Sequence, residues 1–251
     1  LKIGGKGVFI KELEVALLNN QADIAVHSAK DMPAIFNKNF TYNTVLSRAD
    51  VRDVIISNKN WQVKQNLCIA TSSLRRQLQL AKLYPNFNYK MIRGNINSRI
   101  QKLHSHYSDA LILAKAGLDR LQMTNKINHI FSIDEILPAC AQGALIVEYC
   151  HSNTQIQNMV SKIMDSVTEY CVKTERLVVK MLQVECHNPV AVYANIKNNI
   201  LNIQAKVIDP QDYNNIYFSK IQGEIKDYKK LAMQVVQDLN LQGVAKIIAD
   251  F

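Results

Sequence analysis

Residues 67–84 read LCIATSSLRRQLQLAKLY and already point to the fold class. The apolar run from Leu67 to Ala70 predicts a short buried strand, and the apolar spacing from about Ser73 to Tyr84 predicts a helix. The small polar residues between them predict a turn in which Ser72 or Ser73 caps the helix. A strand that leads through a short loop into a helix is the first half of a βαβ unit, so the stretch indicates an α/β fold.

The same alternation of strands and helices extends through the first 150 residues. Two more helices are predicted over about 8–19 and 95–104, and strands at 23–27, 54–57, 89–92, 110–113 and 144–148. Such alternation predicts mainly parallel sheets. After about Ser152 the order changes, which indicates a separate α+β domain. Its predicted elements are helices at 154–164 and 168–182, strands at 190–196, 200–207 and 216–221, and a helix at 227–239.

The composition is that of a globular protein with surplus positive charge. Of 251 residues, 48% are hydrophobic and 20% are charged, and 30 Lys plus Arg against 21 Asp plus Glu give a net charge of +9. This balance excludes a generally disordered chain, and no apolar run reaches the roughly 18 residues of a membrane span. The five cysteines form no CxxC pair and have no metal-site spacing. They are typical of reduced thiols in a cytoplasmic protein and predict no metal site.

Arginine is concentrated in one part of the chain. Seven of the eight arginines lie between Arg48 and Arg120. Because guanidinium groups bind carboxylate or phosphate through paired hydrogen bonds, this clustering indicates a fixed anionic ligand. TSSLRRQ (71–77) and RGNINSR (93–99) each place arginines where a strand leads into a capped helix, with Asn95 as the expected cap in the second, an arrangement that binds anions. Each alone could be a capped surface helix with solvated arginines, but two at the carboxyl ends of strands favour a shared pocket.

Two further segments carry reactive side chains. HSAKDMP (27–33) follows a predicted strand and offers Lys30 as a cation and Asp31 as a carboxylate that can move a proton, although such a pair is usually solvated surface. Cys186 lies in a predicted loop between a helix and a strand. His187 would favour its thiolate and Glu185 would favour its thiol, so a small buried hydrophobe is the alternative interpretation of this cysteine.

Together these segments resemble the porphobilinogen deaminase family, also called the hydroxymethylbilane synthases. The motifs run in order through essentially the whole chain. They are GGKG (4–7), FIKELE (9–14), HSAKDMP (27–33), TSSLRRQ (71–77), RGNINSR (93–99), LAKAGLDRL (113–121) and AQGAL (141–145). The resemblance implies a transferase of haem biosynthesis that joins four porphobilinogen molecules head to tail, with loss of ammonia, into linear hydroxymethylbilane.

The resemblance also implies an arrangement of domains. Two α/β domains similar to periplasmic binding proteins would flank a cleft, and a smaller C-terminal α+β domain would follow. Residues 1–46 and 143–161 would form the first domain, 50–138 the second and 166–251 the third. The first domain would lack its N-terminal part, since the opening strand and helix of the family have no counterpart before Leu1.

By motif match, the resemblance implies the site residues. Asp31 would be the catalytic group, and a dipyrromethane cofactor would be held by a thioether to Cys186. The other cofactor-binding residues would be Lys30, Ser28, Thr71, Ser73, Arg75, Arg76, Arg93 and Gly94. Substrate would be bound by Arg93, Arg99, Arg120, Lys2 and Lys6. The expected partner is porphobilinogen alone, with no nucleic acid, membrane or metal, for a monomer in the cytoplasm.

Two other classes of function stay open from the sequence. Val184 and Glu185 stand where the family usually has two glycines before the cysteine. A non-catalytic protein that binds polycarboxylates but has lost cofactor assembly is therefore the alternative. Nucleic-acid binding would account for the +9 charge in general terms, but it predicts a basic face with many aromatic side chains, and aromatic residues make up only 7% of the chain.

Overall fold

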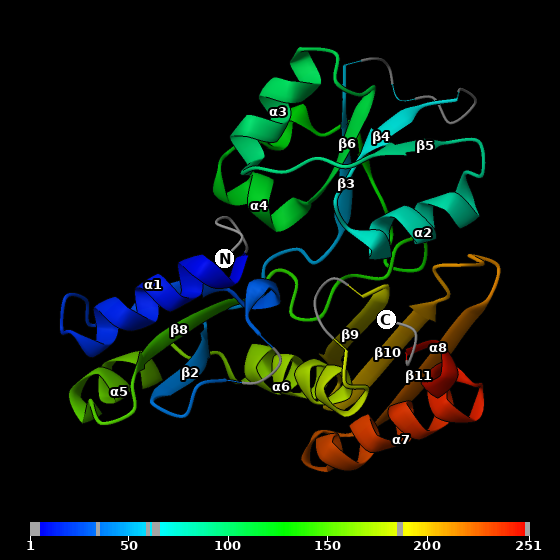
Figure 1. Cartoon of the computed structure of the whole chain (residues 1–251). Helices are drawn as coiled ribbons and strands as arrows, with labels where there is room; N and C mark the ends of the chain where they lie inside the picture. Colours follow the sequence, from blue (N-terminus) through cyan, green and yellow to red (C-terminus); the bar gives the residue numbers. More distant parts are fainter. Residues whose placement is uncertain (1–5, 34–35, 59–60, 62–65, 185–187, 249–251) are drawn as a thin grey trace.

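The structure, a computed structural model, describes residues 6–33, 36–58, 61, 66–184 and 188–248, and contains three sheets (Figure 1). The first sheet has helices on both faces. Leu17 of α1 (Lys6–Leu18) packs on one face, and Val160 of α5 (Thr154–Ser161) packs on the other. The strand order is β1 (Ala25–Ser28), β8 (Leu145–Cys150) and β2 (Phe40–Val45).

The second sheet is likewise enclosed between helices. Its order is β5 (Asn88–Lys90), β4 (Cys68–Ala70), β6 (Ala110–Ala114), β3 (Asp53–Ser57) and β7 (His129–Ile130). Alternate residues of β3 enter different cores, because successive side chains of a strand point to opposite faces. Ile55 packs with α2 (Leu74–Leu83), whereas Val54 and Ile56 pack with α3 (Ile96–His104) and α4 (Lys115–Arg120).

The third sheet is antiparallel and forms the smaller C-terminal unit. Its order is β11 (Ile216–Glu224), β10 (Ile200–Ile208) and β9 (Val190–Lys197). Alternate residues of β10, from Leu201 to Val207, are fully buried against the helices. These helices are α6 (Ser166–Met181), α7 (Tyr228–Leu241) and α8 (Val244–Ile248). Three short 3-10 turns complete the described elements: η1 (Ala29–Asp31), η2 (Thr124–Lys126) and η3 (Ile225–Asp227).

The predicted fold class is confirmed, but the predicted strand directions are wrong. Among the described strands, only β4–β5 and β4–β6 pair in parallel, whereas β3 and β8 are antiparallel to all their neighbours. These two are the strands that follow the crossings between the first two sheets, at 46–52 and 131–144. β3 and β8 each begin at the edge of the sheet where a crossing arrives. Their neighbours end at that same edge, so β3 and β8 run in the opposite direction. The domain boundaries implied by the resemblance stay a prediction.

Glu175 of α6 is wholly buried where both crossings meet the third sheet. Its Oε1 accepts hydrogen bonds from Nη1 of Arg48, at 2.6 Å, and from the backbone N–H of Ala194, at 2.7 Å. Its Oε2 accepts from Nη2 of Arg48, at 3.0 Å, and from the N–H of Ala141, at 2.5 Å. Arg48 belongs to the first crossing, Ala141 to the second and Ala194 to β9. One carboxylate therefore ties both crossings to the third sheet.

The crossings contain backbone that needs such support. Leu46 and Ala141 have φ values of 61° and 59°, in the left-handed region that costs residues with a Cβ about 1–3 kcal/mol. Gly143 has a φ of 88°, and a Cβ there would lie 2.5 Å from the carbonyl oxygen of Ala49. Only glycine fits this close approach. The bond from Ala141 to Glu175 is one of the contacts that hold the strained segment.

Replacing Glu175 by Gln should lower the free energy of unfolding by about 3–5 kcal/mol, because the guanidinium of Arg48 would stay buried without its counter-ion. The new amide N–H₂ would also face a backbone N–H that now donates to the carboxylate. Urea unfolding followed by circular dichroism measures the change. Glu224→Gln, which breaks an exposed pair with Lys226, is the matched control and should leave unfolding unchanged. Equal unfolding midpoints for the two variants would contradict the structural role of Glu175.

Candidate active site

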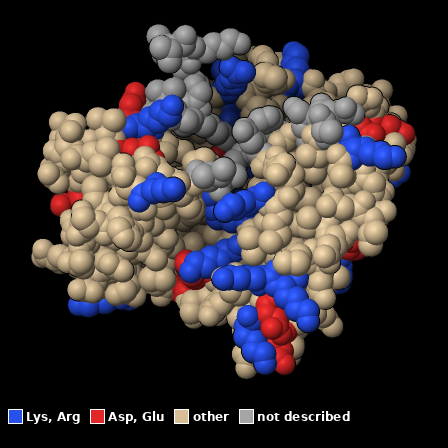
Figure 2. Space-filling view, turned by 60° about the horizontal axis from the view of Figure 1, so that its bottom comes forward, with Lys and Arg blue, Asp and Glu red and all other residues tan. Residues whose placement is uncertain are grey.

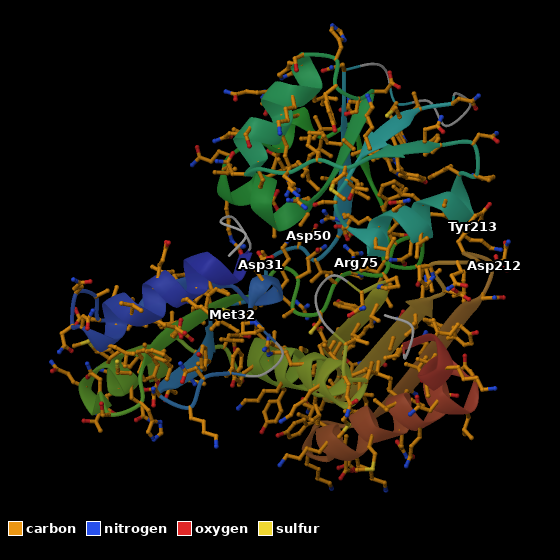
Figure 3. The ribbon with its side chains drawn as sticks, in the orientation of Figure 1. Asp31, Met32, Asp50, Arg75, Asp212 and Tyr213 are labelled. Atoms are coloured by element: carbon orange, nitrogen blue, oxygen red, sulfur yellow. The ribbon has the colours of Figure 1, made fainter. Side chains whose placement is uncertain are left out.

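The turn that carries Asp31 follows directly from β1. Ala29 donates its N–H to the carbonyl oxygen of Ala144, at 3.1 Å, and accepts from the N–H of Met32, at 3.4 Å. Ala29 and Met32 are buried, whereas Lys30 and Asp31 stay partly exposed. Figure 3 shows Asp31 on the side of the first sheet that faces the second. The turn is therefore anchored by its apolar residues and presents its two charged ones.

The β4–α2 loop has the predicted capped geometry. Ser73 is the N-cap of α2, and its Oγ accepts from the N–H of Arg76 at 3.4 Å. Thr71 Oγ1 accepts from the N–H of Ser73 at 3.1 Å, and the Thr71 N–H donates to the carbonyl of Lys90 at 2.9 Å. The loop is thus fixed to the neighbouring strand, and the N-terminus of α2 lies at the carboxyl end of β4 as expected.

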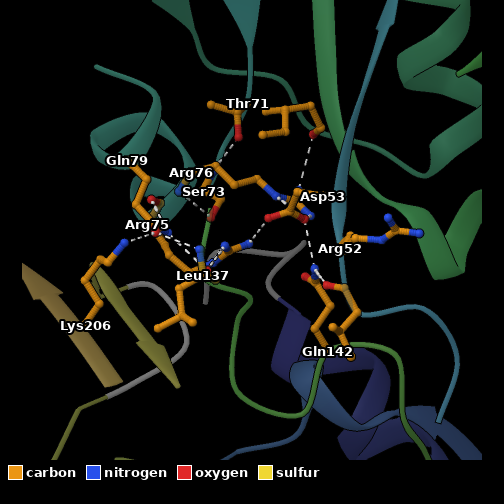
Figure 4. A network of polar contacts seen from close by, with 12 residues as sticks. Arg52, Asp53, Thr71, Ser73, Arg75, Arg76, Gln79, Leu137, Gln142 and Lys206 are labelled. Carbon is orange, nitrogen blue, oxygen red and sulfur yellow. Dashed lines mark hydrogen bonds and ion pairs between the residues drawn. The ribbon is translucent and has the colours of Figure 1, made fainter. Parts of the chain in front are cut away.

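Arg75 and Arg76 are more deeply buried than the sequence indicated, and both bind Asp53 (Figure 4). Arg75 Nη2 lies 2.8 Å from Oδ2 of Asp53, and Arg76 Nη2 lies 2.7 Å from Oδ1. Gln142 Nε2 also donates to Oδ1, at 2.9 Å. Two guanidinium groups therefore share one carboxylate, which leaves one positive charge in excess at the N-terminus of α2.

The charges of this cluster hold one another in their ionised states. Burial alone would raise the pKa of Asp53, but the charges and hydrogen bonds of Arg75 and Arg76 outweigh it and hold that pKa well below its usual range. Burial lowers the pKa of Arg75, and the charge of Asp53 opposes the shift. A guanidinium stays protonated in proteins, so the excess positive charge is permanent at neutral pH.

Lys206 brings a further cation to the same cluster from β10. Its Nζ donates to Oε1 of Gln79 at 3.2 Å, and Gln79 Nε2 donates to the carbonyl of Leu137 at 3.1 Å. Arg75 Nη1 donates to that same carbonyl at 2.7 Å. Burial lowers the pKa of Lys206, while the charge of Asp134 opposes and that of Arg75 adds to the shift. Figure 2 shows a face where Lys and Arg side chains gather near the middle.

The β5–α3 loop forms the second predicted anion site. Gly94 has a φ of 118°, and a Cβ there would lie 2.2 Å from Oγ of Ser98, so the turn requires glycine. Asn95 caps α3 by accepting from the N–H of Ser98 at 2.8 Å, as predicted. Arg99 Nε donates to the carbonyl of Gly94 at 2.7 Å, which holds the guanidinium against the loop.

Charges from two other segments act on the guanidinium of Arg99. Burial lowers the pKa of Arg99, the positive charge of Arg76 lowers it further, and the negative charge of Asp31 opposes the shift. Asp31 comes from the first sheet, whereas both arginines come from the second. The structure therefore brings the predicted catalytic carboxylate within electrostatic reach of Arg99, a predicted ligand-binding arginine that is itself within reach of Arg76.

The remaining predicted residues lie around this centre or outside the described chain. Arg93 is exposed, and its carbonyl accepts from Nζ of Lys102 at 3.1 Å. Arg120 Nη2 donates to the carbonyl of Gly143 in the second crossing, at 2.8 Å. Ser28 ends β1, half-buried beside the turn. Lys6 begins α1, and Lys2 and Cys186 lie outside the described residues.

Sequence reasoning missed Asp53 and Gln142, which organise the arginine cluster. Asp53 opens the strand DVIIS, whose next three residues are apolar, and a charged residue at the start of a buried strand was the available signal. Its partner Arg76 is more than 20 positions away, so no local pattern identifies the pair. In the part of the chain described, no group of three or more His, Cys, Asp or Glu could hold a metal ion, and no helix could cross a membrane.

Replacing Asp53 by Asn should lower the free energy of unfolding by about 3–5 kcal/mol, because two buried guanidinium groups would lose their counter-ion. Since the folded pKa of Asp53 is depressed, its contribution is present above the unfolded value of about 3.9 and is lost as the pH falls through the folded value. The difference between wild type and variant should thus be constant from about pH 5 to 8 and shrink in acid.

Urea unfolding over this pH range measures the effect. Asp50→Asn is the matched control, since Asp50 pairs with the partly exposed Arg52 and should contribute at most about 1 kcal/mol. A loss for Asp53→Asn no larger than that of the control would contradict the assignment.

Comparison with known proteins assigns the chain. Residues 1–158 match the family model described as "Porphobilinogen deaminase, dipyromethane cofactor binding domain", and residues 169–241 match "Porphobilinogen deaminase, C-terminal domain". The porphobilinogen deaminase of Legionella pneumophila strain Lens is 39% identical over 99% of this chain and 82% of its own length. That of Thiobacillus denitrificans is 36% identical over 98% of this chain and 81% of its own length.

A solved structure, the BvgS VFT2 domain of Bordetella pertussis, aligns with a TM-score of 0.40 and 15% identity over 63% of this chain and 68% of that one. This score is too low to bear on function. The two family models cover nearly the whole chain, and the relatives agree with them. The chain belongs to the porphobilinogen deaminase family.

Proposed function

We propose that this chain joins four porphobilinogen molecules head to tail, each with loss of ammonia, into linear hydroxymethylbilane on a dipyrromethane primer. The family assignment supports this transferase reaction of haem biosynthesis, and the matching N-terminal model is that of the cofactor-binding domain. The relatives carry the name of the enzyme, and none of these matches favours the non-catalytic polycarboxylate-binding alternative. The reaction needs a site that retains a polyanion and a group that handles protons.

The donor set of the described residues fits a ligand with several carboxylates. Each pyrrole ring carries an acetate and a propionate, so the bound chain gains two negative charges at each addition. The observation that carries the proposal is the pair of buried guanidinium groups on the single carboxylate of Asp53. Their excess charge lies at a helix N-terminus, where anions are stabilised. When bound, the dipyrromethane supplies the primer to which the first substrate is joined.

The residues proposed to hold this ligand lie on three segments. Charge-assisted hydrogen bonds contribute about 1.5–3 kcal/mol each, so several together can retain a product that lengthens without dissociating. The segments are the Asp31 turn, the β4–α2 loop and the β5–α3 loop. The residues proposed for the cofactor are Ser28, Lys30, Thr71, Ser73, Arg75, Arg76, Arg93 and Gly94, and those for substrate are Arg93, Arg99, Arg120, Lys2 and Lys6.

Asp31 is proposed as the catalytic group. Its partly exposed carboxylate can accept hydrogen bonds from pyrrole N–H groups and stabilise the positive charge that develops as the substrate loses ammonia. It can also take a proton from the ring carbon where the new bond forms. Arg99, whose pKa is influenced by Asp31, is suited to orient a substrate carboxylate beside it.

Cys186 is proposed as the point of cofactor attachment. Of the described cysteines, Cys171 has its thiol pKa raised to about 12, chiefly by burial, and burial also raises that of Cys68. Both are therefore poor nucleophiles at neutral pH. No disulfide joins any two of the four described cysteines, which supports the further proposal that the protein acts in the reducing cytoplasm. We also propose that it acts as a monomer, and sedimentation velocity of the pure protein tests this.

Asp31→Asn should lower turnover by about 10²–10⁴-fold, because the variant keeps the shape of the side chain but cannot accept a proton. Porphobilinogen consumption and ammonia release by the full chain measure this. The exposed Asp23 offers the matched control, and Asp23→Asn should keep wild-type turnover. Urea unfolding of Asp31→Asn should stay within about 0.5 kcal/mol of wild type. Turnover by Asp31→Asn within a few-fold of wild type would contradict the role of Asp31.

A further inference from the structure

Arg176 of helix α6 contacts the Asp31 turn, which follows β1 of the first sheet. Its Nη1 donates to the carbonyl of Ala29 at 3.4 Å, and its Nη2 donates to the carbonyl of Pro33. Its guanidinium carbon lies 4.1 Å from the centre of the Phe36 ring. The two carbonyls lie on either side of Asp31 in the chain. One side chain therefore bridges the beginning and the end of the turn.

Only a guanidinium can make all of these contacts together. Its planar fork donates two hydrogen bonds in fixed directions while its face stacks on an aromatic ring. The ring of Phe36 stacks in turn on Tyr42 of β2, with centroids 3.9 Å apart and planes 13° apart. Burial, together with a hydrogen bond to Glu148, raises the pKa of Tyr42, so this ring stays neutral. We call these contacts of Arg176 the Arg176 clamp. The clamp includes the two stacked rings, and Tyr42 links it to β2 of the first sheet.

The beginning of the turn has a second anchor, in the strand that precedes it. His27, the residue before Ser28, has its Nε2 at 2.7 Å from Oε2 of Glu148, and Glu148 is wholly buried in β8. This pair holds the end of β1 from within the sheet. From α6, Val172 packs in the same apolar cluster as Ala29 and Met32, and Arg176 adds the hydrogen bonds that span the turn. Without Arg176, the segment from Lys30 to Pro33 would keep its apolar anchors and its anchor at β1 but lose the bridge beyond Asp31.

Arg176 directly follows Glu175 in α6, and this adjacency links the Asp31 turn to the rest of the site. Glu175 fixes the two crossings, while Arg176 fixes the Asp31 turn. Adjacent residues of a single helix therefore determine how the turn lies relative to the crossings, and hence relative to the arginine loops of the second sheet. Since Arg99 and Asp31 already act on each other electrostatically, a shift of the turn would change this relation.

We propose that Arg176 is a positioning residue for the reaction. It holds the turn from Ala29 to Pro33 so that the carboxylate of Asp31 faces the substrate, and it does so through backbone carbonyls without touching the substrate itself. The proposal rests on the function proposed above for Asp31. Arg176 affects the rate of the chemical step more than the retention of the polyanion, because the turn contributes Lys30 to ligand binding whereas the arginines proposed to bind the ligand belong to the second sheet.

The test compares Arg176→Gln and Arg176→Lys with Lys180→Gln, a control that removes an exposed cation from the same helix. Amide hydrogen exchange of the peptide over 27–36, read by mass spectrometry, reports on the turn whether or not the protein turns over. Arg176→Gln should speed exchange of its protected amides about 10-fold or more, Arg176→Lys should give an intermediate value, and the control should match wild type.

Steady-state kinetics of the full chain supply the second readout. Arg176→Gln should lower kcat about 10-fold or more while KM changes less than about 3-fold, the pattern of an interaction that acts in the transition state. Wild-type exchange in Arg176→Gln would contradict the claim that Arg176 holds the turn. Faster exchange with unchanged kcat would contradict the claim that holding the turn matters for catalysis. If Arg176→Gln does not fold, Arg176→Lys decides, and wild-type exchange in it refutes the proposal. An inactive wild type would instead refute the proposed function, while the exchange data still test the clamp.

Discussion

The buried carboxylate of Glu175 is the contact on which the arrangement of the three sheets depends. It binds the guanidinium of Arg48 and the backbone amides of Ala141 and Ala194, so that both crossings and β9 meet at one pair of oxygens. Removing a carboxylate and a guanidinium from water is costly, and only a fully bonded geometry offsets that cost. This network holds the crossings in the arrangement that places the Asp31 turn near the arginine loops.

A second buried carboxylate sets the charge of the site. Asp53 neutralises one of the two guanidinium groups of Arg75 and Arg76 and holds both in place, so that the proposed binding of an anion would need little reorganisation. A solvated arginine would lose side-chain entropy on binding, whereas these have lost it already on folding. Positive charge that is in excess, permanent and rigid suits a ligand whose negative charge increases at every step. The partly exposed Asp31 is left as the carboxylate that can take part in chemistry.

Much of this could be predicted from the sequence, but only where the cause is local. A cap at Ser72 or Ser73, which the structure gives as Ser73, and a cap at Asn95 were predicted because a capping side chain acts within a single turn of chain. Most helices were predicted from their apolar spacing, although the six-residue α4 was missed along with β2, β7 and α8, which are short or carry a mixed pattern. The pairs that organise the site were not predicted. Asp53 with Arg76, and Glu175 with Arg48, join segments that only the folded chain brings together, and the antiparallel entry of β3 and β8 follows from the crossings.

The most direct test of polymerisation on a covalent primer is the intact mass of the purified full chain, before and after a limited amount of porphobilinogen is added. The predicted result is a mass above that of the polypeptide by one dipyrromethane, followed on addition of substrate by a ladder of species that differ by one pyrrole unit. Cys186→Ser should lack both the adduct and the ladder. A wild-type mass equal to that of the bare polypeptide, with no ladder after substrate is added, would contradict the account.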